Sequence, residues 1–247
     1  MNLRLILIAS FFFFNFSYSQ SEVYELKVYD MKFGKSADIL HDYFKDALIP
    51  ALNRQGVENI GAFEETGEAL PKKIYLIIPY KNMQAYLDVY ETLVEDDQFK
   101  SSAEAYRNTP PDQIPFERYE SRFIRSTWGF PNLVKPDEDL DQFELRIYES
   151  YHENALRRKL KMFNEDEFEI FEDAGLRTVF FGKNISGDQM PSLTYMLAFK
   201  DKETHQKAWS NFGHHPDWLR ISNLDEYANT VSDITRVFLK SLPYSQF

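Results

Sequence analysis

The sequence predicts an α+β protein in which two tandem ferredoxin-like βαββαβ units pack sheet against sheet. The first observation is an internal repeat: residues 24–29 (YELKVY) align with residues 143–148 (FELRIY) at an offset of 119 residues (143 − 24). The same offset, without a gap, pairs Gly56 with Gly175. The second observation is that each copy shows strand and helix signals in the order β-α-β-β-α-β. One chain therefore carries two copies of one structural module.

The N-terminal residues have the features of a secretory signal peptide. Arg4 precedes an apolar run at residues 5–16, and the small residues Ser17 and Ser19 follow at the positions that signal peptidase recognises. The run is shorter than the ~20 residues that a membrane-spanning helix needs. We therefore expect residues 1–19 to be a cleaved signal peptide. The protein would then be exported, periplasmic or secreted, with no stable membrane insertion after cleavage.

The charge and the cysteine content exclude several classes of protein. The chain has 28 Lys and Arg against 39 Asp and Glu, which gives a formal net charge of −11. A polyanion repels phosphate backbones, so we expect no nucleic-acid partner. The chain has no cysteine. An exported form would therefore be held by packing alone, to which its many aromatic side chains can contribute.

The first strand and the first helix of each copy follow from hydrophobic periodicity. Residues 23–30 and 142–149 alternate between apolar and polar side chains, which is typical of half-buried strands. Apolar residues at helical spacing follow: Leu40, Tyr43, Phe44, Ala47, Leu48, Ala51 and Leu52 in the first copy, and Leu156, Leu160, Phe163, Ile170 and Phe171 in the second. Asn154 is the expected N-cap of the second of these helices. Gly56 and Gly175 lie where a left-handed residue would end each helix.

The later elements also come in pairs. Further strands are predicted at residues 57–64, 74–80 and 119–125 in the first copy and at residues 176–183, 193–200 and 234–239 in the second. A second helix begins after Asn82 in one copy and after Asp201 in the other, both good N-cap residues. Turn residues and acidic residues between the copies are typical of a linker. We therefore expect a first domain at residues 20–125, a linker at 126–141 and a second domain at 142–247.

The two faces of each predicted sheet differ in character. Two helices cover only one face of a four-stranded sheet, so tandem sheets can cover each other's second face and form a barrel. We expect the apolar side chains of the first strands, such as Leu26 and Leu145, to face the helices. A polar set on the same strands would then face the barrel interior: Glu25, Lys27, Tyr29, Glu144, Arg146 and Tyr148.

The second copy carries an ordered series of short motifs. In chain order these are residues 143–148 (FELRIY), Gly175, residues 195–201 (YMLAFKD), Trp209 and residues 216–218 (PDW). This series resembles the NIPSNAP family. The first copy keeps the opening motif but has Tyr90 and Phe99 where the second has tryptophans. The two resemblances together cover nearly the whole chain after the predicted signal peptide.

The resemblance implies a dimeric α+β barrel formed within one chain. That superfamily includes cofactor-free monooxygenases, haem-dependent enzymes and simple binding proteins. Members of the NIPSNAP family proper lack an agreed catalytic activity, and eukaryotic relatives are associated with mitochondria and with recruiting other proteins. The resemblance therefore assigns no catalytic residue to this sequence, and a fold by itself does not assign a function.

The polar set is the candidate ligand-binding site. Carboxylates, cations and phenols that converge in a partly dry cavity can bind a polar ligand and shift one another's pKa values. Alternatively, the Glu25–Lys27 and Glu144–Arg146 pairs are structural ion pairs where the two sheets meet. The residues alone leave both interpretations open.

The histidines predict no metal site. The adjacent residues His214 and His215 cannot both reach one ion without unusual backbone geometry, and no third ligand is suitably spaced. His205 lies on the apolar stripe of its helix, which favours a buried structural role. His41 is the candidate axial ligand if the protein handles haem, as some members of the superfamily do.

Three functions remain open at this point. The first is a non-catalytic module that binds a small molecule in the barrel or an unknown protein partner. The second is a cofactor-independent oxygenase that acts on a small aromatic or polyketide-like molecule. The third is a haem-handling protein. Motifs for nucleophilic catalysis, zinc hydrolysis and phosphate binding are absent, and we expect no resident cofactor.

Overall fold

Each copy of the repeat folds into a four-stranded antiparallel sheet with its helices on one face. The computed structural model describes residues 21–247, so the predicted signal peptide, residues 1–19, lies outside the described residues. The strands are β1 (Val23–Met31), β2 (Gly61–Glu65), β3 (Ile74–Tyr80), β4 (Phe116–Ser126), β5 (Gln142–Glu149), β6 (Arg177–Asn184), β7 (Ser192–Phe199) and β8 (Asp233–Ser241). The strand predicted at 57–64 starts late, because Asn59 with its φ of 55° breaks the extended backbone.

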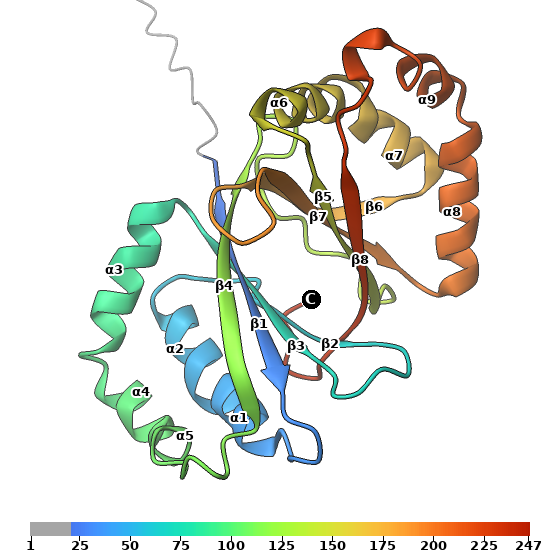
Figure 1. The fold of residues 1–247 in the computed structure, drawn as a ribbon. Helices are drawn as coiled ribbons and strands as arrows, with labels where there is room; N and C mark the ends of the chain where they lie inside the picture. The colour runs from blue at the N-terminus through green and yellow to red at the C-terminus, as the bar shows by residue number, and fades with distance from the viewer. Residues whose placement is uncertain (1–20) are drawn as a thin grey trace, which may run out of the picture.

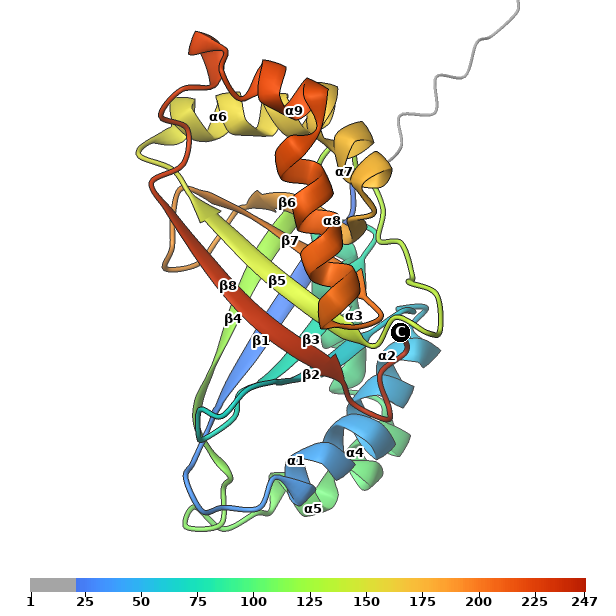
Figure 2. The same cartoon turned by 90° about the vertical axis from the view of Figure 1, so that its right-hand side faces the viewer.

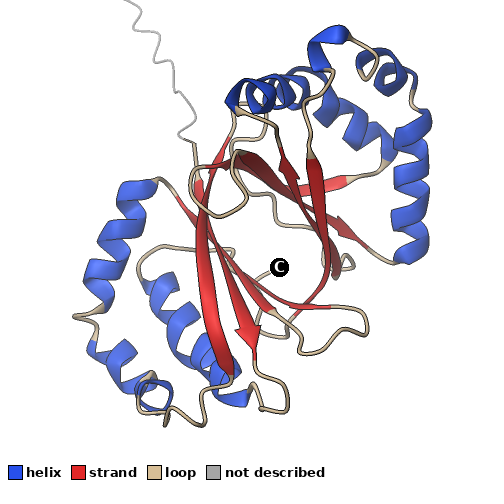
Figure 3. Cartoon of the chain, in the orientation of Figure 1, coloured by secondary structure: helices blue, strands red, loops and turns tan. Residues whose placement is uncertain are grey.

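The two sheets join at both edges into one closed barrel. The strand order is β1-β3-β2-β8-β5-β7-β6-β4, and all neighbours are antiparallel. The two seams between the copies are the β2–β8 and β4–β6 pairs, with Phe63 opposite Ser241 and Ile124 opposite Asn184. Figures 1 and 3 show the barrel in the middle, with one copy's helices on each side. The predicted fold, with both halves of the barrel supplied by one chain, is confirmed.

The helices lie outside the barrel, and those of the two copies cover opposite sides of it (Figure 2). In the first unit they are α1 (Asp38–Asp42), the π-helical turn η1 (Tyr43–Leu48), α2 (Ile49–Arg54), α3 (Met83–Leu93), α4 (Asp97–Ser102) and α5 (Glu104–Arg107). In the second they are α6 (Glu153–Met162), the π-helical turn η2 (Phe163–Glu167), α7 (Phe168–Ala174), α8 (Lys202–His214), α9 (Pro216–Ile221) and the 3₁₀ turn η3 (Asp225–Tyr227). Within residues 21–247, no helix has the length and apolar character that crossing a bilayer requires.

The helix caps follow the sequence in most places. The side chains of Asn82 and Asp201 accept hydrogen bonds from backbone N–H groups in the first turns of α3 and α8, as predicted. The prediction that Asn154 is the N-cap of α6 is wrong. His152 is the N-cap there, and its Nδ1 accepts from the backbone N–H of Ala155 over 3.1 Å. An imidazole nitrogen can do what a carboxamide oxygen does at this position, which a cap rule based on residue type does not foresee.

Three hydrophobic clusters divide the core. Two of them lie between the sheets and the helices, one in each unit. The third draws side chains from all eight strands and therefore fills the barrel interior. Tyr24, Phe63, Phe143 and Phe180 are its largest fully buried members. The barrel is thus a packed core over most of its length.

Candidate functional site

The polar set lies on the helix-covered face of the barrel. Lys27 Nζ donates to the hydroxyl of Tyr90 on α3 over 3.0 Å. Glu144 accepts from the indole N–H of Trp209 on α8, also over 3.0 Å. The two tyrosines of the set belong to the cores beneath the helices. The expected barrel-facing orientation is therefore wrong for the whole set: Glu25, Lys27, Tyr29, Glu144, Arg146 and Tyr148.

The reverse orientation has a physical reason. A buried carboxylate needs hydrogen-bond donors, and the helices α3 and α8 supply them as phenol, indole and imidazole groups. The middle of the barrel interior is filled by apolar side chains, among them Leu26 and Leu145. Because side chains alternate between the faces of a strand, placing Glu25 and Glu144 under the helices places these leucines inside the barrel.

In the first unit the polar residues form a closed cluster. Glu25 is 1 % exposed, and its carboxylate accepts from the hydroxyls of Tyr80 (3.2 Å), Tyr90 (3.2 Å) and Ser121 (2.6 Å). Lys27 Nζ lies 3.4 Å from the same carboxylate. Burial, together with the nearby Glu25 charge, raises the pKa of Tyr80 and Tyr90 above that of an ordinary phenol. Both phenols therefore stay protonated as donors, and this cluster satisfies itself.

In the second unit the equivalent carboxylate has different partners. Glu144 is 1 % exposed and accepts from Arg146 Nη1 (2.6 Å), His205 Nε2 (3.0 Å) and Trp209 Nε1 (3.0 Å). The Arg146 guanidinium lies over the Trp209 ring at 4.3 Å and also donates to the hydroxyl of Tyr148 over 3.1 Å. The site thus combines a buried ion pair with one imidazole.

The imidazole of His205 has one nitrogen available to a ligand. Its Nε2 faces the carboxylate of Glu144, a pure acceptor, so we assign the proton to Nε2 and the lone pair to Nδ1. Nδ1 makes no hydrogen bond to any residue in the range 21–247. In the first copy Tyr86 stands at the corresponding position (205 − 119). The second copy therefore presents a proton acceptor where the first presents a phenol.

His205 opens into a groove between the start of α8 and β8. The groove has a volume of about 420 Å³, and its apolar walls are Phe143, Phe199, Phe238 and Leu239. We call it the His205 groove. The imidazole packs edge-on against Phe199 and Phe238, with ring centres 4.5 and 5.4 Å away. The first unit contributes Thr66 to the rim, whose backbone N–H donates to the carbonyl of Phe238 over 2.9 Å. The groove thus lies at a seam between the copies.

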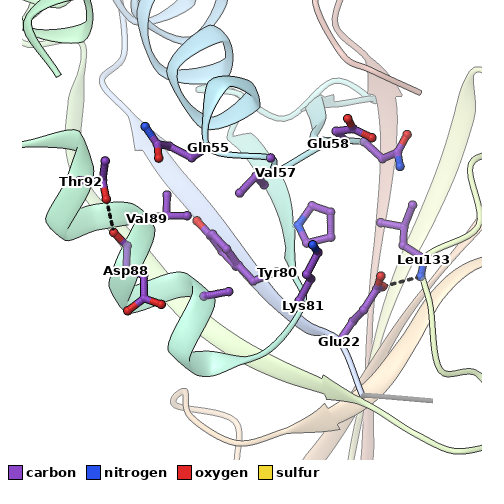
Figure 4. A pocket seen from close by; sticks show the side chains of 14 residues that line it. Glu22, Gln55, Val57, Glu58, Tyr80, Lys81, Asp88, Val89, Thr92 and Leu133 are labelled. Carbon is purple, nitrogen blue, oxygen red and sulfur yellow. Dashed lines mark hydrogen bonds between the residues drawn. The ribbon is translucent and has the colours of Figure 1, made fainter. Parts of the chain in front are cut away.

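A second pocket of about 420 Å³ lies in the first unit, beside α3 and the end of β3 (Figure 4). Its charged lining residues Glu58, Lys81 and Asp88 are exposed. Glu22 accepts from the backbone N–H of Leu133 over 2.7 Å. Because these charges remain hydrated, they offer a ligand weaker anchoring than the partly enclosed imidazole of His205.

The other histidines do not assemble a site. His41 lies on α1, outside the barrel, and its Nδ1 is 2.7 Å from the hydroxyl of Tyr244. It does not face the barrel interior, as an axial haem ligand there would. His214 donates to a carbonyl of its own helix, and His215 caps the N-terminus of α9. The described part of the chain holds no group of three or more His, Cys, Asp or Glu that could bind a metal ion.

The contact between His205 and Glu144 was not predicted from the sequence. His205 was expected to be a buried structural histidine because it lies on the apolar stripe of its helix. The available signal was its spacing: His205 and Trp209 are four residues apart, so they share one helical face. Both donate to Glu144 from that face.

Known proteins share this architecture. Two solved structures assigned provisionally as monooxygenases, from Fusobacterium nucleatum subsp. nucleatum and Lactobacillus acidophilus, are similar to the chain with a TM-score of 0.57 each. They are 14 % and 12 % identical to it and match 90 % of it, covering 93 % and 94 % of their own chains. A chlorite dismutase variant from Candidatus Nitrospira defluvii matches with 6 % identity and a TM-score of 0.50, over 90 % of this chain and 92 % of its own. These similarities establish the dimeric α+β barrel fold alone.

Family membership rests on the sequence match. No curated protein matches the chain significantly. The NIPSNAP family model, however, matches it twice, over residues 24–127 and 143–246. The two matches coincide with the two halves of the barrel and together span most of the chain. The protein therefore belongs to the NIPSNAP family, as a tandem of two such domains.

Proposed function

We propose that this protein is an exported small-molecule-binding protein whose site is the His205 groove of the second unit. The observation that carries the proposal is the difference between the two copies at one buried carboxylate. Glu25 is surrounded by hydroxyl donors and its own lysine, whereas Glu144 orients an imidazole whose other nitrogen is available. In the first copy the carboxylate belongs to a closed cluster of polar groups. In the second copy it orients His205, whose Nδ1 is a hydrogen-bond acceptor beside a groove.

The chemistry of the groove favours one class of ligand. Three phenyl rings and a leucine form its walls, and such walls favour a planar apolar molecule. Nδ1 of His205 accepts a hydrogen bond, so the ligand should carry an acidic hydroxyl group. Lys202 at the rim can attract an anionic substituent. A small phenol or a polyketide-like aromatic has all of these properties.

Titration calorimetry with two naphthalenes tests the proposal. 1-Naphthol has the donor group, and 1-methoxynaphthalene has the same rings without it. We expect wild-type protein to bind 1-naphthol about tenfold more tightly, the worth of one well-formed hydrogen bond. His205→Phe keeps the aromatic contacts and should abolish the difference. Tyr86→Phe, the matched change in the first copy, should retain it. The proposal would be refuted if the wild type and the His205→Phe variant bound 1-naphthol with equal affinity.

A second candidate, cofactor-independent oxygenation, uses the same groove. It is supported by the apolar walls around a single base, and by the fold similarity to two proteins assigned provisionally as monooxygenases. Nδ1 of His205 would remove a proton from an acidic methylene group of an aromatic substrate. The carbanion would react with molecular oxygen, with one oxygen atom kept as a carbonyl and the other leaving as water. Oxygen uptake with anthrone, lost in the His205→Phe variant, would support this candidate, and no uptake by the wild type would dismiss it.

A further inference from the structure

The core of the second unit contains a buried ion pair. Lys159 on α6 and Glu167 in η2 are 4 % and 2 % exposed, and Lys159 Nζ donates to Glu167 Oε2 over 2.7 Å. Burial raises the pKa of Glu167 even though the ammonium of Lys159 is adjacent. Removing two charges from water is expensive, and apolar replacements of such pairs are often neutral or stabilising. Stability alone therefore does not account for the pair.

The first copy shows that the fold does not need these charges. Leu40 and Leu48 stand at the positions equivalent to Lys159 and Glu167, 119 residues earlier. Both leucines are buried under the same helical layer, at 0 % and 3 % exposure. The first copy also forms the π-helical turn at this place, so the turn does not depend on the ion pair.

The contacts of Lys159 lead to the His205 groove. Its ammonium lies 5.8 Å from the centre of the Tyr148 ring. The hydroxyl of Tyr148 accepts from Arg146 Nη2 over 3.1 Å, and Arg146 Nη1 donates to Glu144 over 2.6 Å. Glu144 in turn accepts from His205 over 3.0 Å. Lys159 and His205, which are Leu40 and Tyr86 in the first copy, are thus the two ends of one network of contacts.

Two cations lie near the ring of Tyr148. The Arg146 guanidinium is 5.4 Å from the ring centre, and the Lys159 ammonium, supplied by α6, is 5.8 Å from it. The ammonium of Lys159 is itself enclosed by the rings of Phe163 at 4.5 Å and Trp218 at 5.5 Å. Since Lys159 has little freedom to move, it can fix the ring that it contacts.

We propose that Lys159 and Glu167 are positioning residues for the His205 groove. Their ion pair fixes the ring of Tyr148, whose hydroxyl steadies the guanidinium–carboxylate pair of β5. That pair keeps the imidazole in its Nε2–H tautomer with Nδ1 available to a ligand. The inference rests on the proposed function for the purpose of the groove, but the coupling is measured on the imidazole without any ligand.

Long-range ¹H–¹⁵N spectra of the His205 ring, which report its tautomer, test this coupling. The decisive variant carries the first-copy residues, Lys159→Leu with Glu167→Leu. We expect it to unfold at the same or a higher temperature than the wild type. We also expect His205 to lose its preference for the Nε2–H tautomer, because a loosened guanidinium no longer holds the Glu144 carboxylate in place against Nε2. The control Lys161→Gln with Glu165→Gln removes a more exposed ion pair near the same end of α6, together with the contact of Lys161 with Glu226, and should change neither the unfolding temperature nor the tautomer.

The residues that surround the imidazole are not substituted in these variants. Its charged neighbours are Glu144 and Arg146 on β5 and Asp201 and Lys202 at the start of α8. From β7 and β8 it is faced by the phenyl rings of the groove. A spectral change in the leucine variant therefore reports the buried network.

An unchanged His205 tautomer in the folded leucine variant would overturn the inference. If that variant does not fold, Lys159→Met with Glu167→Gln, which is closer in shape, is measured in the same way. Failure of this second variant to fold would mark the pair as structural and would also overturn the inference. The proposed function depends instead on binding of 1-naphthol to the wild type, so the two failures are distinguishable.

Discussion

Glu25 and Glu144 are the same carboxylate in two copies of one fold, each 1 % exposed under its own helices. The Glu25 carboxylate contacts a lysine ammonium and accepts hydrogen bonds from three hydroxyl groups. The Glu144 carboxylate accepts hydrogen bonds from a guanidinium, an imidazole and an indole. The duplication thus supplies an internal comparison at each position of the site. Positions with similar side chains in both copies build the barrel. Positions at which the copies differ distinguish the second unit.

Removing the Glu144 carboxylate should destabilise the protein. Glu144→Ala leaves the Arg146 cation, 7 % exposed, without its closest partner. We expect the free energy of unfolding in urea to fall by about 3–5 kcal/mol, as for a broken buried pair. The control Glu165→Ala loses an exposed partner of Lys161 and should cost about 1 kcal/mol or less. Similar losses in both variants would show that the Glu144 pair is not buried as described.

The buried Glu167 should leave a signature in the pH dependence of stability. Its folded pKa is raised by burial, with Lys159 opposing more weakly, so the folded state favours the protonated acid relative to the unfolded state. Its stabilising contribution is therefore complete below the unfolded pKa of about 4.3 and is lost as the pH rises through the folded pKa. Glu167→Gln should flatten that part of the stability curve, measured by urea unfolding between pH 4 and 8. Glu165→Gln, a nearby exposed change, should leave the curve as it is, and an unflattened curve in Glu167→Gln would contradict the assignment.

Replacing Gly175 or Gly213 with alanine should change the stability of the protein in opposite directions. Gly175 ends α7 with a φ of 88°, so Gly175→Ala forces a left-handed alanine and should destabilise the protein by about 1–2 kcal/mol. Gly213 lies in the last turn of α8, where an added Cβ would meet no atom within 4 Å, and Gly213→Ala should stabilise the protein by about 0.4–1 kcal/mol. Thermal unfolding measures both. Changes of the same sign would argue against the described ends of these helices.

The predicted signal peptide gives a separate test. Expression of the full chain in a secreting bacterial host, followed by intact-mass spectrometry, should find a mature protein that begins at Gln20. Replacing Ser17 and Ser19 with bulky Phe should block this cleavage and leave the precursor. A full-length mass in the wild-type sample would contradict both cleavage and the export proposal.

The fold was predictable from the sequence because its signals are local and occur twice. The strands at residues 74–80 and 142–149 and the caps Asn82 and Asp201 follow from short-range patterns. The π-helical turns were not predictable, since they continue the helical spacing of apolar residues and differ only in hydrogen bonding.

The site was half predictable. Periodicity identifies Glu144 and Arg146 as one face of a strand, but it does not say which layer covers that face. That choice depends on donors supplied from α8, and His205 lies 61 residues from Glu144 along the chain. The pairing of a carboxylate with a distant imidazole is a tertiary contact, and no local pattern encodes it.

In the proposed site, Nδ1 of His205 receives the ligand of the second unit. The most direct measurement is the ¹⁵N chemical shift of Nδ1 in wild-type protein during addition of 1-naphthol, with 1-methoxynaphthalene as the control. We expect a saturable shift of the Nδ1 resonance with 1-naphthol and a much smaller shift with the ether. A Nδ1 resonance that stays fixed while 1-naphthol binds elsewhere on the protein, or does not bind, would contradict it.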